Sequence, residues 1–289
     1  MRRIVNSVLL LILFTGTVFA QQEIKLYPEG PKESNEIATP ESYRDPEFII
    51  NISEPRMYAY LAAKEKSTGT AIVICPGGGY WGVSQIKEGS DIAKWYNDLG
   101  VSAFVLYYRM PNGHTTVPLT DAQTALSIIH EHADEWHIDK TKIGIMGFSA
   151  GGHLASTVGT HFKTKIQRPA FMILGYPVVT MKSDLTHKGS RDNLIGKNPT
   201  VELENLYSNE LQVTKNTPPT FIVHATDDKT VPVKNSIQLY QALLDKKVVV
   251  ELDTFAIGGH GFGMRKRGIP VDNWPELLKI WLKTNKLIN

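Results

Sequence analysis

The sequence has little cysteine, little net charge and no long apolar segment, and each shortage excludes a class of protein. A single cysteine, Cys75, among 289 residues excludes an intramolecular disulfide. A formal net charge of +2 argues against a nucleic-acid-binding protein, which needs a basic surface to replace phosphate counterions. Hydrophobic residues at 42% and charged residues at 21% are ordinary values, so a disordered chain, a collagen and a coiled coil are excluded too.

The first 20 residues have the layout of a secretory signal peptide. Arg2 and Arg3 form a basic start, Val8–Phe14 is an apolar centre, and Val18–Ala20 has small residues at the cleavage-site spacing. The apolar centre is too short for a membrane anchor, which takes about 20 apolar residues. No cysteine follows the site to carry a lipid, so we expect cleavage after Ala20 and a periplasmic or secreted protein without a stable membrane anchor.

Continuous apolar runs then alternate with amphipathic segments along most of the chain. Such alternation predicts an α/β fold whose central sheet is mostly parallel and has helices on both faces. The expected strands are Ala71–Cys75, Val101–Tyr108, Lys142–Met146, Ala170–Leu174, Thr220–His224 and Val248–Thr254. The expected helices are Ser90–Leu99, Thr120–Trp136, His153–Thr160, Ser236–Leu244 and Trp274–Thr284. Cys75 ends a buried strand, where we expect a small core residue rather than a nucleophile.

Two segments depart from this alternation. Residues 21–45 are polar and predict an extended lead-in to a catalytic domain at 46–289, which opens with two short strands, Phe48–Ile52 and Met57–Ala62, expected to pair antiparallel. Residues 177–218 are long for a connection and markedly polar. This insert is either a cap over a site or a surface elaboration.

Residues 147–151 match the nucleophile-elbow pattern G-x-S-x-G. They follow an expected strand and precede an expected helix, which is the context that the pattern requires. The tight turn would project the Ser149 oxygen above the sheet at the positive end of the helix. A serine of this kind needs a base and a group that orients the base, in the chain order serine, acid, histidine. Asp227 or Asp228 and then His260 supply that order from loops after two later strands.

The glycines at 77–79 follow the first parallel strand. A phosphate-binding loop is disfavoured, because G-K-S/T does not occur. Exposed backbone N–H groups there would suit an oxyanion, and we expect Gly78, Gly79 and Ala150 to donate to it.

Five motifs together resemble one branch of the α/β-hydrolases, the acetylxylan esterase and feruloyl esterase-like (BD-FAE-like) family. The resemblance covers residues 68–285 and rests on the motifs at 75–80, 107–109, 147–153, 227–232 and 258–263. It implies Ser149 as nucleophile, His260 as base and Asp228 rather than Asp227 as acid, since the family's acid lies three residues before Val-Pro. One departure is Pro76, which stands where many relatives have a histidine that supports the glycine loop.

Other polar residues have competing explanations. Tyr80, His187 and Arg191 are expected to contact substrate, whereas Arg109 and Asp121 are expected to form a structural pair. His153 is expected to be packed rather than catalytic. His130, Asp134 and His137 at i, i+4 and i+7 could hold a metal on one helix face, but without a further ligand a solvated face is favoured and no metal site is predicted.

The resemblance implies a serine esterase, without metal or organic cofactor, that removes short acyl groups, such as acetyl groups on xylan or a related plant polysaccharide. The expected partner is a small-molecule or oligosaccharide ester, and no nucleic acid. An arylformamidase or other amidase, a general carboxylesterase of small molecules and a non-catalytic carbohydrate-binding relative stay open as alternatives.

Overall fold

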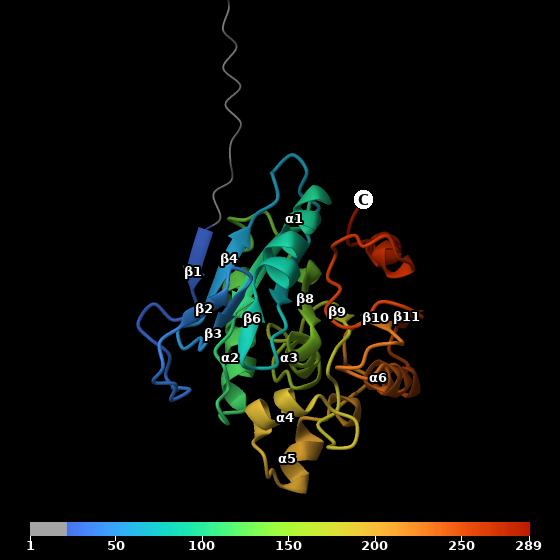
Figure 1. Cartoon of the computed structure of the whole chain (residues 1–289). Coiled ribbons are helices and arrows are strands. Elements are labelled where there is room, and N and C mark those ends of the chain that lie inside the picture. The colour runs from blue at the N-terminus through green and yellow to red at the C-terminus, as the bar shows by residue number, and fades with distance from the viewer. Residues whose placement is uncertain (1–21) are drawn as a thin grey trace, which may run out of the picture.

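The computed structural model describes residues 22–289, so the expected signal peptide lies outside the described residues. The described part contains a large sheet and a small one, with helices packed against the large sheet (Figure 1). The large sheet has the strand order β1 (Gln22–Lys25), β4 (Arg56–Tyr60), β7 (Ser102–Tyr107), β5 (Ala71–Cys75), β8 (Ile143–Phe148), β9 (Met172–Gly175), β10 (Thr220–Ala225) and β11 (Val250–Phe255). The six strands from β7 to β11 are parallel, as the apolar runs predicted, and β1 and β4 are antiparallel additions at one edge.

Helices α1 (Asp91–Asp98), α2 (Thr116–Glu131), α3 (Ser149–Thr160) and α6 (Lys234–Asp245) connect parallel strands. Helix α7 (Trp274–Thr284) follows the last strand, β11. α1 packs against β7, whereas α2 and α3 pack against each other and against β5 and β8. None of the helices within residues 22–289 is both long and apolar enough to cross a membrane.

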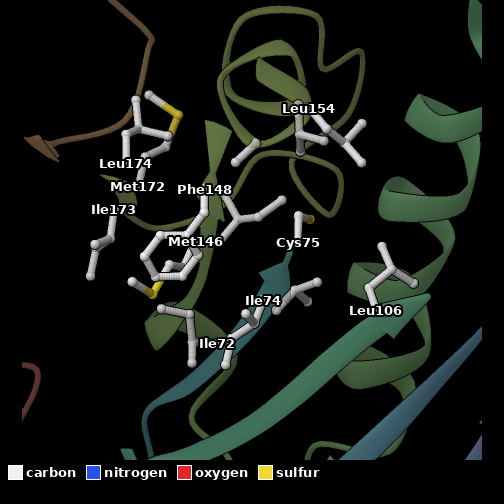
Figure 2. Packing of buried hydrophobic residues seen from close by; sticks show 14 of the residues in the cluster. Ile72, Ile74, Cys75, Leu106, Met146, Phe148, Leu154, Met172, Ile173 and Leu174 are labelled. Atoms are coloured by element: carbon white, nitrogen blue, oxygen red, sulfur yellow. The ribbon is translucent and has the colours of Figure 1, made fainter. Parts of the chain in front are cut away.

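The core lies between the parallel strands and these helices. Ala71–Cys75, Ile143–Phe148 and Thr220–Ala225 are buried at every position, as expected for central strands covered on both faces. Cys75 lies among apolar side chains such as Ile74 and Met146 (Figure 2) and is fully buried. Burial raises the pKa of its thiol, which confirms a packing residue rather than a reactive one.

The lead-in supplies two strands, and the next two strands pair differently from expectation. Within residues 22–45, β1 joins the large sheet and β2 (Ser42–Asp45) joins a small one. The strands near 48 and 57 do not pair with each other. β3 (Phe48–Ile50) lies between β2 and β6 (Gly82–Ser84) in the small sheet, whereas β4 pairs with β1 and β7. Local sequence could not show this, because β6 comes from a loop more than 30 residues further along the chain.

Two helices have boundaries that the sequence did not indicate. α2 begins earlier than expected because Pro118 lies in its first turn, where a missing N–H breaks no helical bond. It ends at Glu131, and His137 has a left-handed φ of 56°, so His130, Asp134 and His137 do not share a helix face. α3 begins at Ser149 rather than His153, because tertiary packing requires the glycines in its first turn.

The expected pair of Arg109 and Asp121 is present and buried. Arg109 Nη2 lies 2.6 Å from Asp121 Oδ1, and the Arg109 backbone N–H donates to Oδ2 at 2.9 Å. The pair fixes the end of β7 to α2, which is the structural role expected of it.

The polar insert contains α4 (Lys188–Ile195), α5 (Val201–Leu206) and a 3-10 turn at Asn209–Leu211. α4 and α5 lie together at the opposite end of the view from the C-terminus (Figure 1). Thr200 caps α5 by accepting a hydrogen bond from the Leu203 N–H, and His187 caps α4 through the Ser190 N–H. The insert is therefore an ordered part of the fold.

Candidate active site

Ser149 lies at the junction of β8 and α3 in a left-handed conformation with φ of 52°. A non-glycine residue is strained there, and the flanking glycines make the turn possible. A Cβ atom on Gly147 would lie 2.0 Å from the Gly151 carbonyl oxygen, and a Cβ on Gly151 would lie 2.0 Å from the Cys75 carbonyl oxygen. The turn thus admits only glycine at both places.

The N-terminus of α3 provides an electrostatic setting for Ser149. The helix begins at Ser149, so the Ala150 N–H is one of the four that have no acceptor within the helix. Helix N-termini carry a partial positive charge that favours a developing anion. This N–H is one of the three donors expected from the sequence.

The backbone of the glycine loop after β5 is constrained by its surroundings. Gly78 and Gly79 have φ of 149° and 66°, and a Cβ on Gly78 would lie 2.1 Å from the Gly82 carbonyl oxygen. Within residues 22–289 the N–H groups of Gly78 and Gly79 donate no hydrogen bond. By contrast, the Gly77 N–H donates to buried Glu88 at 2.8 Å. The two N–H groups therefore stay available for an incoming oxyanion.

Glu88 and Tyr108 support the glycine loop beside Pro76. The other Glu88 oxygen accepts from the Tyr176 hydroxyl at 2.8 Å, and the Tyr108 hydroxyl donates to the Pro76 carbonyl oxygen at 2.8 Å. The loop is thus fixed by a buried carboxylate and a buried tyrosine. Sequence reasoning missed Glu88, because nothing in its local pattern connects it with the glycines.

His260 lies between Ser149 and Asp228. Its Nε2 is 2.9 Å from Ser149 Oγ, and its Nδ1 is 2.6 Å from Asp228 Oδ2. Because a carboxylate only accepts, Nδ1 carries the proton and Nε2 is free to accept the proton of the serine hydroxyl. The structure thus brings the three residues expected to form a triad into a continuous hydrogen-bonded chain.

The two neighbouring aspartates have different surroundings. Asp228 Oδ1 accepts from the Thr230 and Val231 N–H groups, both at 2.9 Å. Asp227 Oδ1 instead accepts from the Gly258 and Gly259 N–H groups at 2.9 and 2.7 Å. Asp227 therefore holds the loop that carries the histidine, and Asp228 contacts the histidine itself.

Asp228 is kept ionised by its hydrogen bonds. Burial alone would raise the pKa of this carboxyl, but hydrogen bonds from His224 and His260 outweigh it and hold the pKa well below its usual value. The carboxylate is consequently charged at neutral pH and can stabilise an imidazolium.

A cavity of about 400 Å³ opens in front of Ser149. It contains groups from the glycine loop, the histidine loop and the insert, so several separate loops converge on the serine. Its lining residues are Phe48, Gly77, Gly78, Gly79, Ser84, Lys87, Glu88, Ser149, His187, Thr230, His260 and Gly261. Within residues 22–289 no group of three or more His, Cys, Asp or Glu side chains could hold a metal ion.

Comparison with known proteins identifies the family. The BD-FAE family profile matches residues 57–243, which include the glycine loop, the elbow and Asp228. The chain belongs to the BD-FAE family. The matched region ends before His260, whose placement comes from the structure.

Two relatives of this family member have names that refer to xylan. An acetylxylan esterase of Xylanibacter ruminicola is 38% identical over 244 residues, which are 82% of this chain and 50% of the relative. An endo-1,4-beta-xylanase B of Butyrivibrio fibrisolvens is 36% identical over 253 residues, 83% of this chain and 38% of the relative. The chain thus spans half or less of the length of each.

A solved structure matches over a larger share of both chains. The acetyl ester-xyloside bifunctional hydrolase of Caldicellulosiruptor lactoaceticus superimposes with a TM-score of 0.81 at 34% identity, over 95% of this chain and 100% of the other. Together with the sheet topology, this likeness confirms the α/β-hydrolase fold predicted from the sequence.

The three residues expected to contact substrate lie in different places. Of the three, only His187 lines the Ser149 cavity of this BD-FAE member. Burial of its imidazole, and to a lesser extent the nearby His260, lowers the pKa of His187. Tyr80 is buried, and its hydroxyl is hydrogen-bonded to His153 Nδ1 at 2.8 Å. Arg191 is bound within the insert by the Met181 carbonyl and Glu204, both at 2.9 Å, and does not line the cavity.

His224 is not among the candidate residues identified from the sequence, yet it contacts the Asp228 carboxylate. Its Nε2 lies 2.9 Å from the Val231 carbonyl oxygen and 3.2 Å from Asp228 Oδ2, and its Nδ1 lies 2.7 Å from Ser236 Oγ. A carbonyl oxygen only accepts, so Nε2 bears the proton and donates to both oxygens. Its position at the end of β10, four residues before Asp228, is the signal that could have indicated it.

Proposed function

We propose that this protein is a serine esterase that removes acetyl groups from xylan or a related plant polysaccharide. The observation that carries the proposal is the hydrogen-bonded chain from Ser149 Oγ through His260 to Asp228, at 2.9 and 2.6 Å. A serine in this arrangement is activated for attack on a carbonyl carbon. The strained elbow and the adjacent helix N-terminus are both features of such nucleophiles.

In the first half-reaction Ser149 Oγ attacks the ester carbonyl carbon while its proton moves to His260 Nε2. The Asp228 carboxylate stabilises the imidazolium that forms. The carbonyl oxygen becomes an anion, and the N–H groups of Gly78, Gly79 and Ala150 are positioned to donate to it. The tetrahedral species then collapses, the C–O bond to the sugar breaks, and His260 gives its proton to the departing sugar hydroxyl.

In the second half-reaction a water molecule attacks the acyl carbon with His260 as base. The same N–H groups stabilise the second oxyanion, and its collapse breaks the bond to Ser149 Oγ, which regains its proton from His260. The product is a free carboxylic acid such as acetic acid.

Two lines of support favour acetyl groups on xylan. The relatives named above include an acetylxylan esterase and an acetyl ester-xyloside hydrolase, and the latter covers nearly the whole chain. The Ser149 cavity is also small, at about 400 Å³, and much of its wall is glycine backbone and polar side chains. Such a wall suits a short acyl group on a hydroxylated carrier better than a long acyl chain.

The proposed site of action is outside the cytoplasm. The first 20 residues have the layout of a secretory signal peptide, and a polymeric plant substrate would be met outside the cell or in the periplasm.

The test is acetate release from acetylated xylan and from 4-nitrophenyl acetate by the wild type, Ser149→Ala and His132→Gln. We expect both substrates to be hydrolysed by the wild type and by His132→Gln, whose partly exposed histidine follows the end of α2 and does not line the Ser149 cavity. Ser149→Ala should lower kcat by about 10⁴-fold or more. Hydrolysis of the small ester alone would contradict the xylan substrate, and full activity of Ser149→Ala would contradict the nucleophile.

A further inference from the structure

A second cavity of about 570 Å³ lies beside the Ser149 cavity and has no part in the chemistry described above. Its walls come from the lead-in, the tip of the glycine loop, the segment after β7 and the insert. The lining residues, which define what we name the Trp81 groove, are Glu36, Ile37, Ala38, Thr39, Asn51, Tyr80, Trp81, Met110, Asn112, Gly113, Asp192, Asn193, Gly196 and Lys197.

The groove contains an exposed aromatic ring on a firm support. Trp81 is 43% exposed although it adjoins the buried Tyr80. Its ring packs on Phe48 with centroids 5.7 Å apart, and the Arg44 guanidinium lies over both rings at 4.8 Å from Phe48 and 5.7 Å from Trp81. A large aromatic ring held in place offers contact area at a low cost in conformational entropy. It therefore suits a ligand with a flat apolar face.

The groove is also rich in hydrogen-bond acceptors. The side-chain nitrogens of Asn51, Asn112 and Asn193 donate to the carbonyl oxygens of Pro40, Asn35 and Gly79, which orients the three amides. Their Oδ1 atoms accept no hydrogen bond within residues 22–289. Asp192 Oδ1 is buried and lies 3.8 Å from Arg191 Nη1, so it is not counted among them. Three oriented amide acceptors call for a ligand with several O–H donors.

The charges along the groove favour a neutral ligand. Glu36 and Asp192 are acidic and Lys197 is basic, so neither sign dominates. Asp192 Oδ2 is already paired with Lys188, and Glu36 lies 3.6 Å from His114. A sugar ring combines C–H bonds on its faces with hydroxyls on its rim, and so matches both the aromatic ring and the acceptors.

The groove adjoins the Ser149 cavity across the glycine loop. Gly79 lines the Ser149 cavity, whereas Tyr80 and Trp81 line the groove. The Cα atoms of residues 79 and 81 can be at most about 7.6 Å apart, because consecutive Cα atoms are 3.80 Å apart. Phe48 also lines the Ser149 cavity while packing on Trp81. One extended ligand can therefore contact both.

We propose that the Trp81 groove is a subsite for the sugar residues that neighbour the acetylated residue on the same polysaccharide chain. A neighbouring sugar ring stacks on Trp81, and its hydroxyls donate to the amide oxygens of Asn51, Asn112 and Asn193. This subsite rests on the proposed function, since it explains how a small ester cavity acts on a polymer.

The first test compares two substrates in wild type, Trp81→Ala, Trp81→Tyr and Tyr43→Ala. The measured quantity is the ratio of kcat/KM on acetylated xylohexaose to kcat/KM on 4-nitrophenyl acetate. The ratio is needed because the Trp81 N–H donates to the Gly78 carbonyl oxygen, so any effect on the loop changes both rates. We expect Trp81→Ala to lower the ratio about tenfold, or about 1.4 kcal/mol. Trp81→Tyr, which keeps an aromatic ring, should lower it less.

Tyr43→Ala is the matched control. Tyr43 is an aromatic residue that is 66% exposed on β2 and lines neither cavity, so its removal should leave the ratio unchanged. A ratio that Trp81→Ala leaves unchanged would overturn the subsite.

The second test measures binding without catalysis. Ser149→Ala is titrated with unacetylated xylohexaose by calorimetry, alone and combined with Trp81→Ala. We expect the added substitution to weaken binding at least tenfold, and equal binding with and without the Trp81 ring would overturn the subsite. Wild type that binds xylohexaose through Trp81 but releases no acetate from xylan would support the subsite and contradict the proposed function.

Discussion

The two adjoining cavities are built from different parts of the chain. The Ser149 cavity is formed mainly by loops at the carboxyl ends of parallel strands, as the fold requires. The Trp81 groove is formed by the lead-in, the insert, the tip of the glycine loop and the segment after β7, none of which is a strand of the parallel sheet. The difference teaches that the sheet positions the reacting groups, while peripheral segments determine what is presented to them.

The largest expected effect is the loss of activity when the Asp228 carboxylate is removed. Asp228→Asn would let His260 take the wrong tautomer, so kcat should fall by about 10⁴-fold on 4-nitrophenyl acetate and on acetylated xylan alike. The ratio between the two substrates should not change, in contrast to Trp81→Ala. Steady-state kinetics on both substrates measure this.

Asp227→Asn is the matched control for that experiment. An asparagine Oδ1 can still accept from the Gly258 and Gly259 N–H groups, so activity should fall less than about tenfold. Equal losses for the two variants would contradict the assignment of Asp228 as the acid.

His153 connects the insert with the glycine loop. Its Nε2–H donates to the Tyr207 carbonyl oxygen of the insert at 2.8 Å, and its Nδ1 accepts from the Tyr80 hydroxyl of the glycine loop at 2.8 Å. The ring must be neutral to make both bonds. The expectation that His153 is packed rather than catalytic agrees with its complete burial.

The next largest effect is the loss of stability in acid. Burial lowers the pKa of His153 to about 4, against 6.5 for an exposed histidine. Between these values the unfolded chain binds the proton more readily, so stability falls as pH falls. From pH 7.5 to pH 4 this histidine should cost about 3 kcal/mol of unfolding free energy. Urea denaturation of wild type and His153→Gln across this range measures the difference, and parallel pH profiles would contradict it.

Arg191→Gln has the smallest expected effect, and it distinguishes a structural role of Arg191 from a contact with substrate. Its bonds to Met181 and Glu204 join α4 to the rest of the insert, so Arg191→Gln should lower the unfolding free energy by about 1–2 kcal/mol. Its kcat/KM on 4-nitrophenyl acetate should stay within about threefold. An unchanged urea midpoint with a raised KM for acetylated xylan would instead indicate the substrate contact that the sequence suggested.

The sequence predicted the Ser149 cavity much better than the Trp81 groove, for physical reasons. The elbow glycines and the loops with Asp228 and His260 are dictated by local backbone geometry and by chain order after each strand, so short motifs predict them. Glu88 and the asparagines of the groove act through contacts between distant segments. The pairing of β3 with β6 and the first turn of α3 depend on such contacts too, and no local pattern encodes them.

The central claim is that Ser149 is a nucleophile activated by His260 and Asp228. Its most direct test is labelling with a reporter-tagged fluorophosphonate, followed by mass spectrometry of the labelled peptide, in wild type, His260→Gln and Asp228→Asn. We expect one label per chain on Ser149 in the wild type, with labelling slowed by several orders of magnitude in His260→Gln. Labelling of another residue, or labelling of Ser149 at the same rate without His260, would contradict the claim.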